Sequence, residues 1–72
     1  MEKVIVLGYI VELVFDKEDK IYVANAVALP GCMTHGDTLE AAVAEMKIAI
    51  KSHINTARDN KVKVAEPMSI YA

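Results

Sequence analysis

The sequence predicts an α+β fold in which a three-stranded antiparallel sheet is packed by one long helix and followed by a short C-terminal strand. Three observations predict it. Val- and Ile-rich runs, which are typical of strands, fill most of residues 3–27. Apolar residues recur at steps of three and four over residues 39–59, as on one face of a helix. Residues 61–65 then alternate like a strand, which Pro67 ends.

The first strand is expected over residues 3–15, a nearly continuous apolar run. A polar hairpin loop at residues 16–20 and a second strand at residues 21–27 follow it. Both faces of the first strand are apolar, which is typical of a strand that is covered twice or lies at an interface. Because one helix covers only one face, we expect the chain to form a homo-oligomer, either a dimer or a tetramer.

The loop that leads from the second strand to the helix is expected to turn the chain twice. Pro30 fixes its own φ angle, and Gly31 and Gly36 are both expected to bend at positive φ. Residues 32–35, between the two bends, are long enough for one brief third strand.

The helix start is expected to be capped by the side chain of Asp37 or of Thr38, both of which offer an oxygen to free backbone N–H groups. Asp37 with Glu40 three residues later also resembles a capping box. At the other end, Asn60 is expected to take the left-handed conformation that ends many helices.

One apolar stripe on the helix is expected to face the sheet. Its members recur at helical spacing: Leu39, Ala42, Val43, Met46, Ala49, Ile50, Ile54 and Ala57. A second strip of Ala41, Ala44 and Ile48 has two interpretations. It either seats another chain or reflects the high helix propensity of alanine.

The length of 72 residues predicts one domain over residues 1–72. Hydrophobic residues make up 54% of the chain, so it is not disordered. The single cysteine fits a reducing compartment, and no apolar run approaches the roughly 20 residues of a membrane span. We therefore expect a cytoplasmic protein that does not enter a membrane.

The net charge of −2 gives no electrostatic case for binding nucleic acid. The charges are nevertheless segregated, because residues 4–46 hold seven acidic side chains against two lysines, whereas residues 47–72 are basic. Acids near a helix start and bases near its end suit the helix dipole. The alternative is that the acidic hairpin end meets a basic partner.

No residue pattern predicts catalysis, a metal or a cofactor. Cys32 and His35 resemble half of a zinc site, but no second pair of ligands exists. A catalytic Cys–His pair would need a third, orienting group, and Cys32 is expected to be structural. The carboxylates of Glu12, Asp16 and Asp19 match no calcium-loop spacing. A metal-dependent nuclease is therefore only a third, weaker alternative, and we expect no enzyme.

A two-part motif spans the loop and the helix start. Its residues are Leu29, Pro30, Gly31 and Cys32, followed by Gly36, Asp37, Thr38 and Leu39 at the start of the alanine-rich helix. This motif resembles that of the HicB family of antitoxins. The resemblance implies a partial ribonuclease H-like fold. It also implies a partner, a small RNA-cleaving toxin of the HicA type with a catalytic histidine, whose active site such proteins cover. Family members commonly associate as dimers or larger assemblies.

Two departures from the family pattern bear on function. Many family members continue into a DNA-binding domain after the position of Pro67, so we expect no separate DNA-binding domain and no direct DNA binding here. Lys20 stands where the family usually has a hairpin glycine, and Ala28 stands where an acidic residue is common.

The toxin contact is expected at the hairpin end and the loop before the helix. The residues expected to bind the partner are Asp16, Asp19, Tyr22, Met33, His35 and Asp37. The alternative function is a stand-alone homo-oligomeric scaffold or orphan regulatory domain that has no toxin partner.

Overall fold

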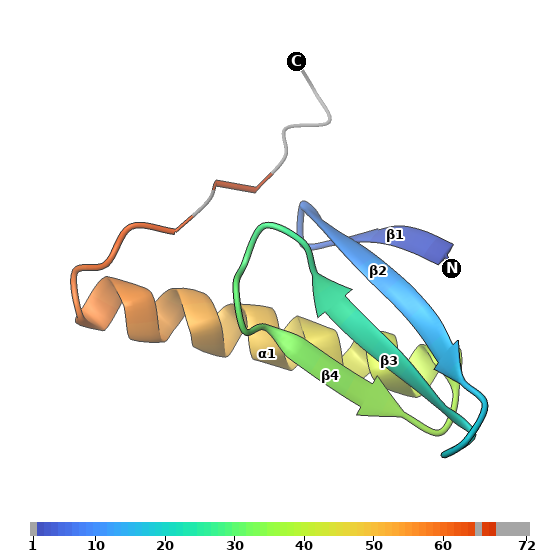
Figure 1. The fold of residues 1–72 in the computed structure, drawn as a ribbon. Coiled ribbons are helices and arrows are strands. Elements are labelled where there is room, and N and C mark those ends of the chain that lie inside the picture. The colour runs from blue at the N-terminus through green and yellow to red at the C-terminus, as the bar shows by residue number, and fades with distance from the viewer. Residues whose placement is uncertain (1, 65, 68–72) are drawn as a thin grey trace.

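The computed structural model describes residues 2–64 and 66–67 of the chain. Four strands precede one helix: β1 (Glu2–Val6), β2 (Tyr9–Asp16), β3 (Ile21–Ala26), β4 (Met33–Gly36) and α1 (Leu39–Asp59). The strands pair antiparallel in the order β1-β2-β3-β4, and α1 lies across one face of this sheet (Figure 1). The α+β class with one long helix is confirmed, but the sheet has four strands before the helix where three were predicted.

The expected first strand is in fact two strands joined by a tight hairpin. Val6 pairs with Tyr9, and the two residues between them, Leu7 and Gly8, both have positive φ angles (51° and 85°). Positive φ at both central residues defines the type I′ turn, whose twist matches that of a hairpin. The prediction of one strand over residues 3–15 was wrong because the apolar composition does not change where the chain reverses.

The second hairpin agrees with the predicted boundaries to within one residue, because β2 ends at Asp16 and β3 ends at Ala26. The Asp16 carboxylate accepts hydrogen bonds from the backbone N–H groups of Glu18 (2.9 Å) and Asp19 (3.2 Å), as aspartate does in many turns. Lys20 closes the loop at a φ of 55°, in the left-handed region that glycine favours. The position at which the family usually has glycine is therefore one that favours glycine in this chain too.

The turn between β3 and β4 is closed by backbone hydrogen bonds. The N–H of Ala26 donates to Cys32 O (3.0 Å), and the N–H of Cys32 donates to Leu29 O (3.0 Å). Gly31 has a φ of 80°, so its predicted bend at positive φ is confirmed.

Gly36 differs from this prediction, because it is not among the residues with positive φ. A glycine is needed at this position because of a close contact, and not because of its φ angle. A Cβ atom at this position would lie 2.5 Å from the backbone nitrogen of Ala42 and 2.8 Å from Ala41 Cβ. Gly36 therefore allows β4 to approach the first turn of α1 closely, a contact that the local sequence does not announce.

The helix has its predicted bounds, Leu39–Asp59, and Thr38 is its N-cap. The Thr38 hydroxyl accepts a hydrogen bond from Ala41 N (3.1 Å), which confirms one of the two expected caps. The capping box of Asp37 with Glu40 was wrong, because a cap at Thr38 places Ala41 at the third helical position.

The left-handed residue after the helix is Lys61, so the prediction that Asn60 takes this conformation was wrong. Asn60 has a φ of −94°, and Lys61 takes the left-handed conformation with a φ of 56°. The N–H groups of Lys61 and Val62 donate to Arg58 O (3.1 Å) and Ala57 O (2.7 Å). This pair of bonds is the Schellman motif, which satisfies carbonyl groups left free at a helix end.

The expected C-terminal strand is absent from residues 61–64, which adopt turn and irregular structure. The backbone N–H groups of Lys61 and Val62 cap the helix, so they are not available to a strand partner. Ala65 and the tail at residues 68–72 lie outside the described residues. Val64 is half-buried and packs against the core.

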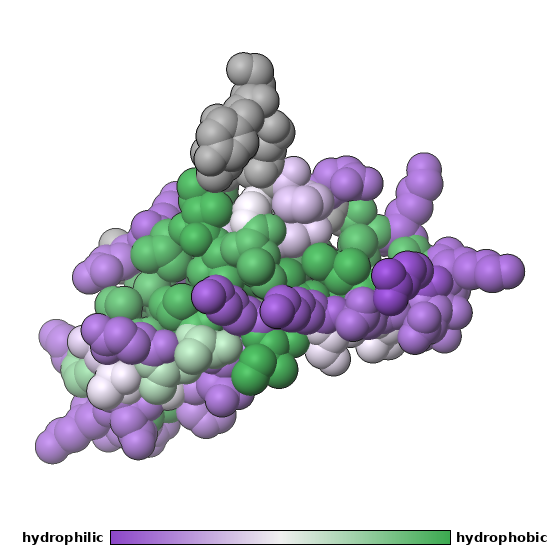
Figure 2. Space-filling view, turned by 180° about the vertical axis from the view of Figure 1, so that it is seen from behind, coloured by the Kyte–Doolittle hydropathy of each residue, from purple (hydrophilic) through white to green (hydrophobic). Residues whose placement is uncertain are grey.

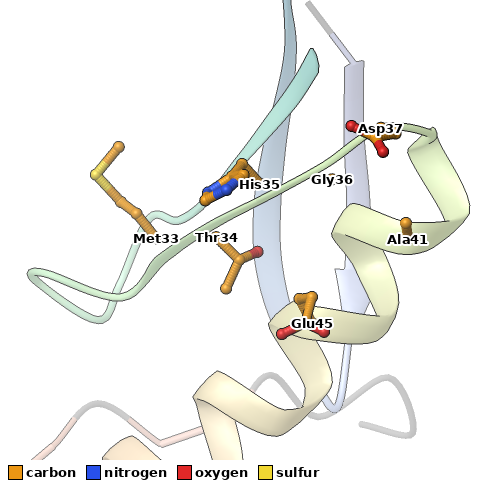
Figure 3. Close-up of a pocket in the computed structure, with 7 residues that line it drawn as sticks. All are labelled: Met33, Thr34, His35, Gly36, Asp37, Ala41 and Glu45. Atoms are coloured by element: carbon orange, nitrogen blue, oxygen red, sulfur yellow. The ribbon is translucent and has the colours of Figure 1, made fainter.

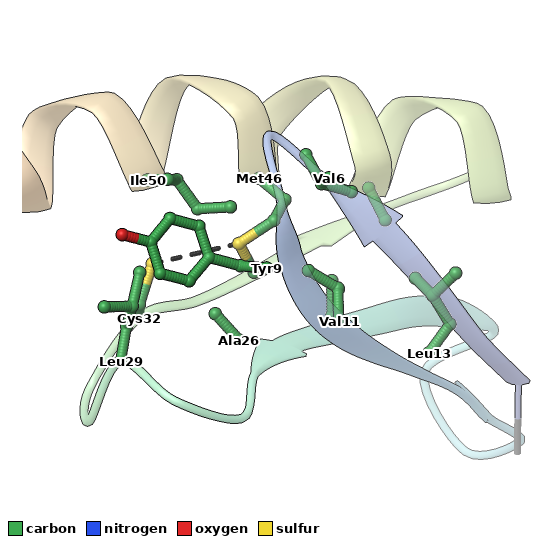
Figure 4. Close-up of a cluster of buried hydrophobic side chains, with 11 residues drawn as sticks. Val6, Tyr9, Val11, Leu13, Ala26, Leu29, Cys32, Met46 and Ile50 are labelled. Atoms are coloured by element: carbon green, nitrogen blue, oxygen red, sulfur yellow. Dashed lines mark hydrogen bonds between the residues drawn. The ribbon is translucent and has the colours of Figure 1, made fainter. Parts of the chain in front are cut away.

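The hydrophobic core lies between the sheet and α1. Tyr9, Val11 and Leu13 point from β2 toward Met46 and Ile50 of the helix (Figure 4). The predicted helical stripe is buried or partly buried along its whole length. No described polar or charged residue is buried, and no helix in the described part of the chain is long and apolar enough to cross a membrane.

Candidate functional site

The outer edge of β4 and the start of α1 enclose an open groove of about 560 Å³. Residues of β4, of the following loop and of the first two turns of the helix line it (Figure 3). They are Met33, Thr34, His35, Gly36, Asp37, Ala41 and Glu45. Among the described strands, β4 pairs with β3 alone, and its other edge faces this groove.

Two contacts between β4 and α1 hold the walls of the groove in place. The Thr34 hydroxyl donates a hydrogen bond to Ala42 O (3.1 Å). Gly36 packs so close to Ala41 and Ala42 that no side chain fits between them. The groove therefore has a fixed width, which is a property of a preformed binding surface.

A second, smaller hollow of about 310 Å³ lies on the other side of β4. It is lined by Asp16, Asp19, Ile21, Val23, Met33, Thr34 and His35. Met33, Thr34 and His35 line both hollows, so β4 forms a ridge between them. We call this ridge with its two hollows the β4 surface.

Five of the six residues expected to bind a partner lie on the β4 surface. Asp16 and Asp19 line the smaller hollow, Asp37 lines the groove, and Met33 and His35 line both. Tyr22 lines neither hollow. Its ring packs against the core and against Phe15, with ring centroids 5.1 Å apart and planes inclined by 57°.

Glu45 and Thr34 also belong to the β4 surface, and sequence reasoning did not select them. Glu45 lies four residues after Ala41, so the two share one side of the helix, and both line the groove. The spacing of four residues is the sequence feature that could have indicated Glu45. It identifies a groove residue only when the side of α1 that borders β4 is known.

The β4 surface is acidic. Asp16, Asp19, Asp37 and Glu45 contribute carboxylates, and no lysine or arginine lines either hollow in the described part of the chain. Asp16 ends β2 and Asp19 lies in the hairpin loop, whereas Asp37 precedes α1 and Glu45 lies in its second turn. The fold thus gathers acids from two segments at one strand, which favours a positively charged partner.

Chemistry at a thiol is disfavoured by the position of Cys32. Its side chain is 4% exposed, and its thiol donates a weak hydrogen bond to the Met46 sulfur at 3.8 Å. Burial raises the pKa of the Cys32 thiol, which keeps it protonated and weakly nucleophilic. His35 is exposed on β4, so the two residues that resembled half of a zinc site lie in different environments.

The described residues contain no preformed group of ligands for a cation. No cluster of three or more His, Cys, Asp or Glu side chains is close enough to hold a metal ion in that part of the chain. This finding covers Glu12, Asp16 and Asp19. The carboxylate of Asp16 is instead engaged by the loop backbone.

The family model of the HicB-like antitoxins of bacterial toxin–antitoxin systems matches residues 9–72. The chain belongs to the HicB-like antitoxin family. It is also 37% identical over 59 residues to the UPF0150 protein Ta0767 of Thermoplasma acidophilum, an alignment that covers 76% of this chain and 86% of that protein. No solved structure matches the chain.

The two halves of the HicB-like motif flank β4 in the structure. Leu29, Pro30, Gly31 and Cys32 form the turn that enters the strand. Gly36, Thr38 and Leu39 form its exit and the helix start. The residues that carry the family resemblance therefore enter and leave the strand at the centre of the acidic β4 surface in this HicB-like antitoxin.

Proposed function

We propose that this HicB-like antitoxin neutralises an RNA-cleaving toxin of the HicA type by binding it through the β4 surface. The observation that supports this proposal best is the gathering of four carboxylates around one strand edge. A toxin that cleaves RNA handles a polyanion and needs a basic surface around its active site. An acidic antitoxin surface matches that surface, so the antitoxin would exclude the RNA.

The proposed role is binding and not catalysis. Cys32 is buried, and the described residues hold no cluster of metal ligands. We further propose that residues 1–72 act as one cytoplasmic domain without direct contact to DNA, because the net charge of −2 opposes binding to phosphates.

The proposal is tested with the toxin encoded by the adjacent reading frame. Asp19→Lys, Asp37→Lys and Glu45→Lys each reverse one charge of the β4 surface. Each variant is expected to weaken toxin binding at least tenfold in calorimetry and to lose protection of RNA in a cleavage assay. Binding by the unchanged protein is expected to weaken as the salt concentration rises.

Glu18→Lys is the matched control. Glu18 is exposed in the same hairpin loop but lines neither hollow. It should leave the toxin affinity within about threefold of that of the unchanged protein, since a charge outside the contact mainly alters association through long-range attraction. Equal losses from Glu18→Lys and Glu45→Lys would assign the effect to net charge and would contradict the β4 surface as the contact.

A stand-alone homo-oligomeric scaffold is the second candidate. Apolar side chains exposed on the sheet face opposite α1, among them Ile5 and Val14, favour self-association. This function predicts that the neighbouring gene is unlike HicA and that co-expression of the two proteins yields no complex. The gene neighbourhood separates the two candidates.

A further inference from the structure

The two flanks of α1 differ in charge because of where its buried residues stand. These residues are Ala42, Met46, Ile50 and Ala57. Consecutive residues of a helix are turned by about 100°, since one turn takes about 3.6 residues. The residue directly before each buried one therefore lies on one flank of α1, and the residue directly after it lies on the other.

The flank before the buried residues borders β4, because Ala41 and Glu45 line the groove there. The flank after them carries three exposed cations, Lys47, Lys51 and Arg58. They are four and seven residues apart, so they lie in one row along the helix axis. We call this row the basic flank. It lies on the side of α1 that faces away from the β4 surface.

The helix dipole accounts for only one of these cations. Arg58 lies in the last turn, where a positive charge suits the dipole. Lys47 and Lys51 lie in the middle of α1, and no acidic residue stands three or four positions from either. They are instead four residues apart from each other, a spacing at which like charges destabilise a helix. A negative charge from outside the helix would remove this repulsion.

An apolar hollow of about 320 Å³, here called the α1 hollow, adjoins the basic flank. It is lined by Leu39, Glu40, Val43, Ala44 and Lys47. Ile48, one turn after Ala44, is 63% exposed and adds apolar surface beside Lys47. Seen from behind, hydrophilic side chains run in a row across an otherwise hydrophobic surface (Figure 2). Cations and aliphatic side chains thus lie side by side on the helix.

We propose that the basic flank and the α1 hollow bind an acidic amphipathic helix of another protein. Such a helix presents apolar side chains at steps of three and four residues, with carboxylates beside them. The apolar side chains fill the α1 hollow and cover Ile48, and the carboxylates pair with the lysines. From Val43 to Arg58 the flank is about 22 Å long at about 1.5 Å per residue, which matches about four turns of a partner helix.

The same features disfavour a nucleic acid as the occupant. Proteins that bind single strands stack the bases on aromatic side chains. α1 contains no Phe, Tyr or Trp, and none of the residues that line the α1 hollow is aromatic. The aliphatic hollow also gives phosphates no contact, and the net charge of −2 opposes the attraction of a polyanion.

The toxin is not the expected occupant either. The β4 surface is proposed to bind a basic toxin, and a basic protein surface is repelled by Lys47 and Lys51. The groove beside β4 and the α1 hollow lie on opposite flanks of α1. An occupant of one therefore leaves the other open, and this site is independent of the proposed function.

The experiment measures the binding of a labelled synthetic peptide by fluorescence anisotropy. The peptide has about 15 residues, with leucines at steps of three and four and glutamates beside them. Saturable binding is expected, and it should weaken as the salt concentration rises. The double variant Lys47→Glu with Lys51→Glu should weaken binding about tenfold or more, and Ile48→Gln about threefold or more. Circular dichroism checks that these exposed substitutions leave the helix intact.

The matched control is the double variant Lys17→Glu with Lys20→Glu. It changes the net charge by the same amount in the loop between β2 and β3, which does not line the α1 hollow. It should keep the peptide affinity within about threefold of that of the unchanged protein. A peptide of the same composition with its leucines and glutamates scrambled should bind about tenfold more weakly.

Absence of saturable binding by the amphipathic peptide would overturn the proposal, as would equal losses from the two double variants. Tighter binding of a single-stranded RNA of equal charge than of the peptide would assign the basic flank to nucleic acid instead. Lys47→Glu with Lys51→Glu is also expected to keep the toxin affinity within about threefold. A failure of this site and a failure of the β4 surface therefore give different results.

Discussion

Gly36 and Ala42 lie so close together that a Cβ atom on Gly36 would be 2.5 Å from the Ala42 nitrogen. This contact joins β4 to the first turn of α1, next to the hydrogen bond from Thr34 to Ala42 O. It thereby sets the width of the groove between the strand edge and the helix. Because the clash is with backbone atoms, no side-chain rotation relieves it.

Gly36→Ala is therefore expected to lower the free energy of unfolding by about 3 kcal/mol, at the upper end of the usual cost of overpacking. Urea denaturation followed by circular dichroism measures this change. Gly31→Ala is the matched control, since space is free around Gly31 but its φ of 80° strains an alanine. It should cost about 1–2 kcal/mol. A Gly36→Ala variant as stable as Gly31→Ala would contradict the close approach of β4 and α1.

The two candidate helix caps can be separated by alanine substitution. Thr38→Ala removes the hydroxyl that accepts from Ala41 N and should destabilise the protein by about 1 kcal/mol. Asp37→Ala should cost less than about 0.5 kcal/mol, because its exposed side chain is not the cap. Thermal unfolding of both variants measures the difference. A larger loss of stability from Asp37→Ala than from Thr38→Ala would show that Asp37, and not Thr38, caps the helix.

Lys20 and Lys61 occupy left-handed positions, with φ angles of 55° and 56°. Lys20→Gly and Lys61→Gly should each raise the free energy of unfolding by up to about 1 kcal/mol. The gain is relief of the left-handed strain, partly offset by the greater freedom of glycine in the unfolded chain. Chemical denaturation measures it. Lys17→Gly, in the same loop but without positive φ, should give no gain.

Stability is expected to fall at alkaline pH because two buried acids release their protons. Burial raises the pKa of the Cys32 thiol above its ordinary 9.0. Burial, and then the negative charge of Glu66, raise the pKa of the Tyr9 hydroxyl above 10.0. The folded chain therefore holds these protons more tightly than the unfolded chain, so their contribution is complete below pH 9 and is lost as pH rises through the folded values.

Denaturation midpoints from about pH 7 to about pH 11 measure this loss. Cys32→Ala should reduce the fall, because its thiol no longer titrates. In this variant, the remaining loss of stability comes from the ionisation of Tyr9 and begins at higher pH. A midpoint that rises above pH 9 would contradict the burial of both groups.

The helix and the β4 motif were predictable because their signals are local. The three-and-four spacing of apolar residues defined Leu39–Asp59, and the turn at Gly31 needed only a residue that tolerates positive φ. Most of the expected partner residues also lie on one surface, since the hairpin acids and the loop acids are brought together by neighbouring strands. Tyr22 lines neither hollow and faces the core, since the side that a strand residue faces depends on which side of the sheet the helix covers.

The sequence by itself determined the family, the helix with its buried stripe, and the strand composition of the N-terminal region, since each of these depends on residue type and short-range spacing. Only the tertiary structure decided where the first apolar run reverses at Leu7 and Gly8, and which of its faces is buried. A strand that is apolar on both faces can bury either face, and packing against α1 determines which face is buried. The same packing explains Gly36, whose small size is required by a neighbour that only the folded chain brings near.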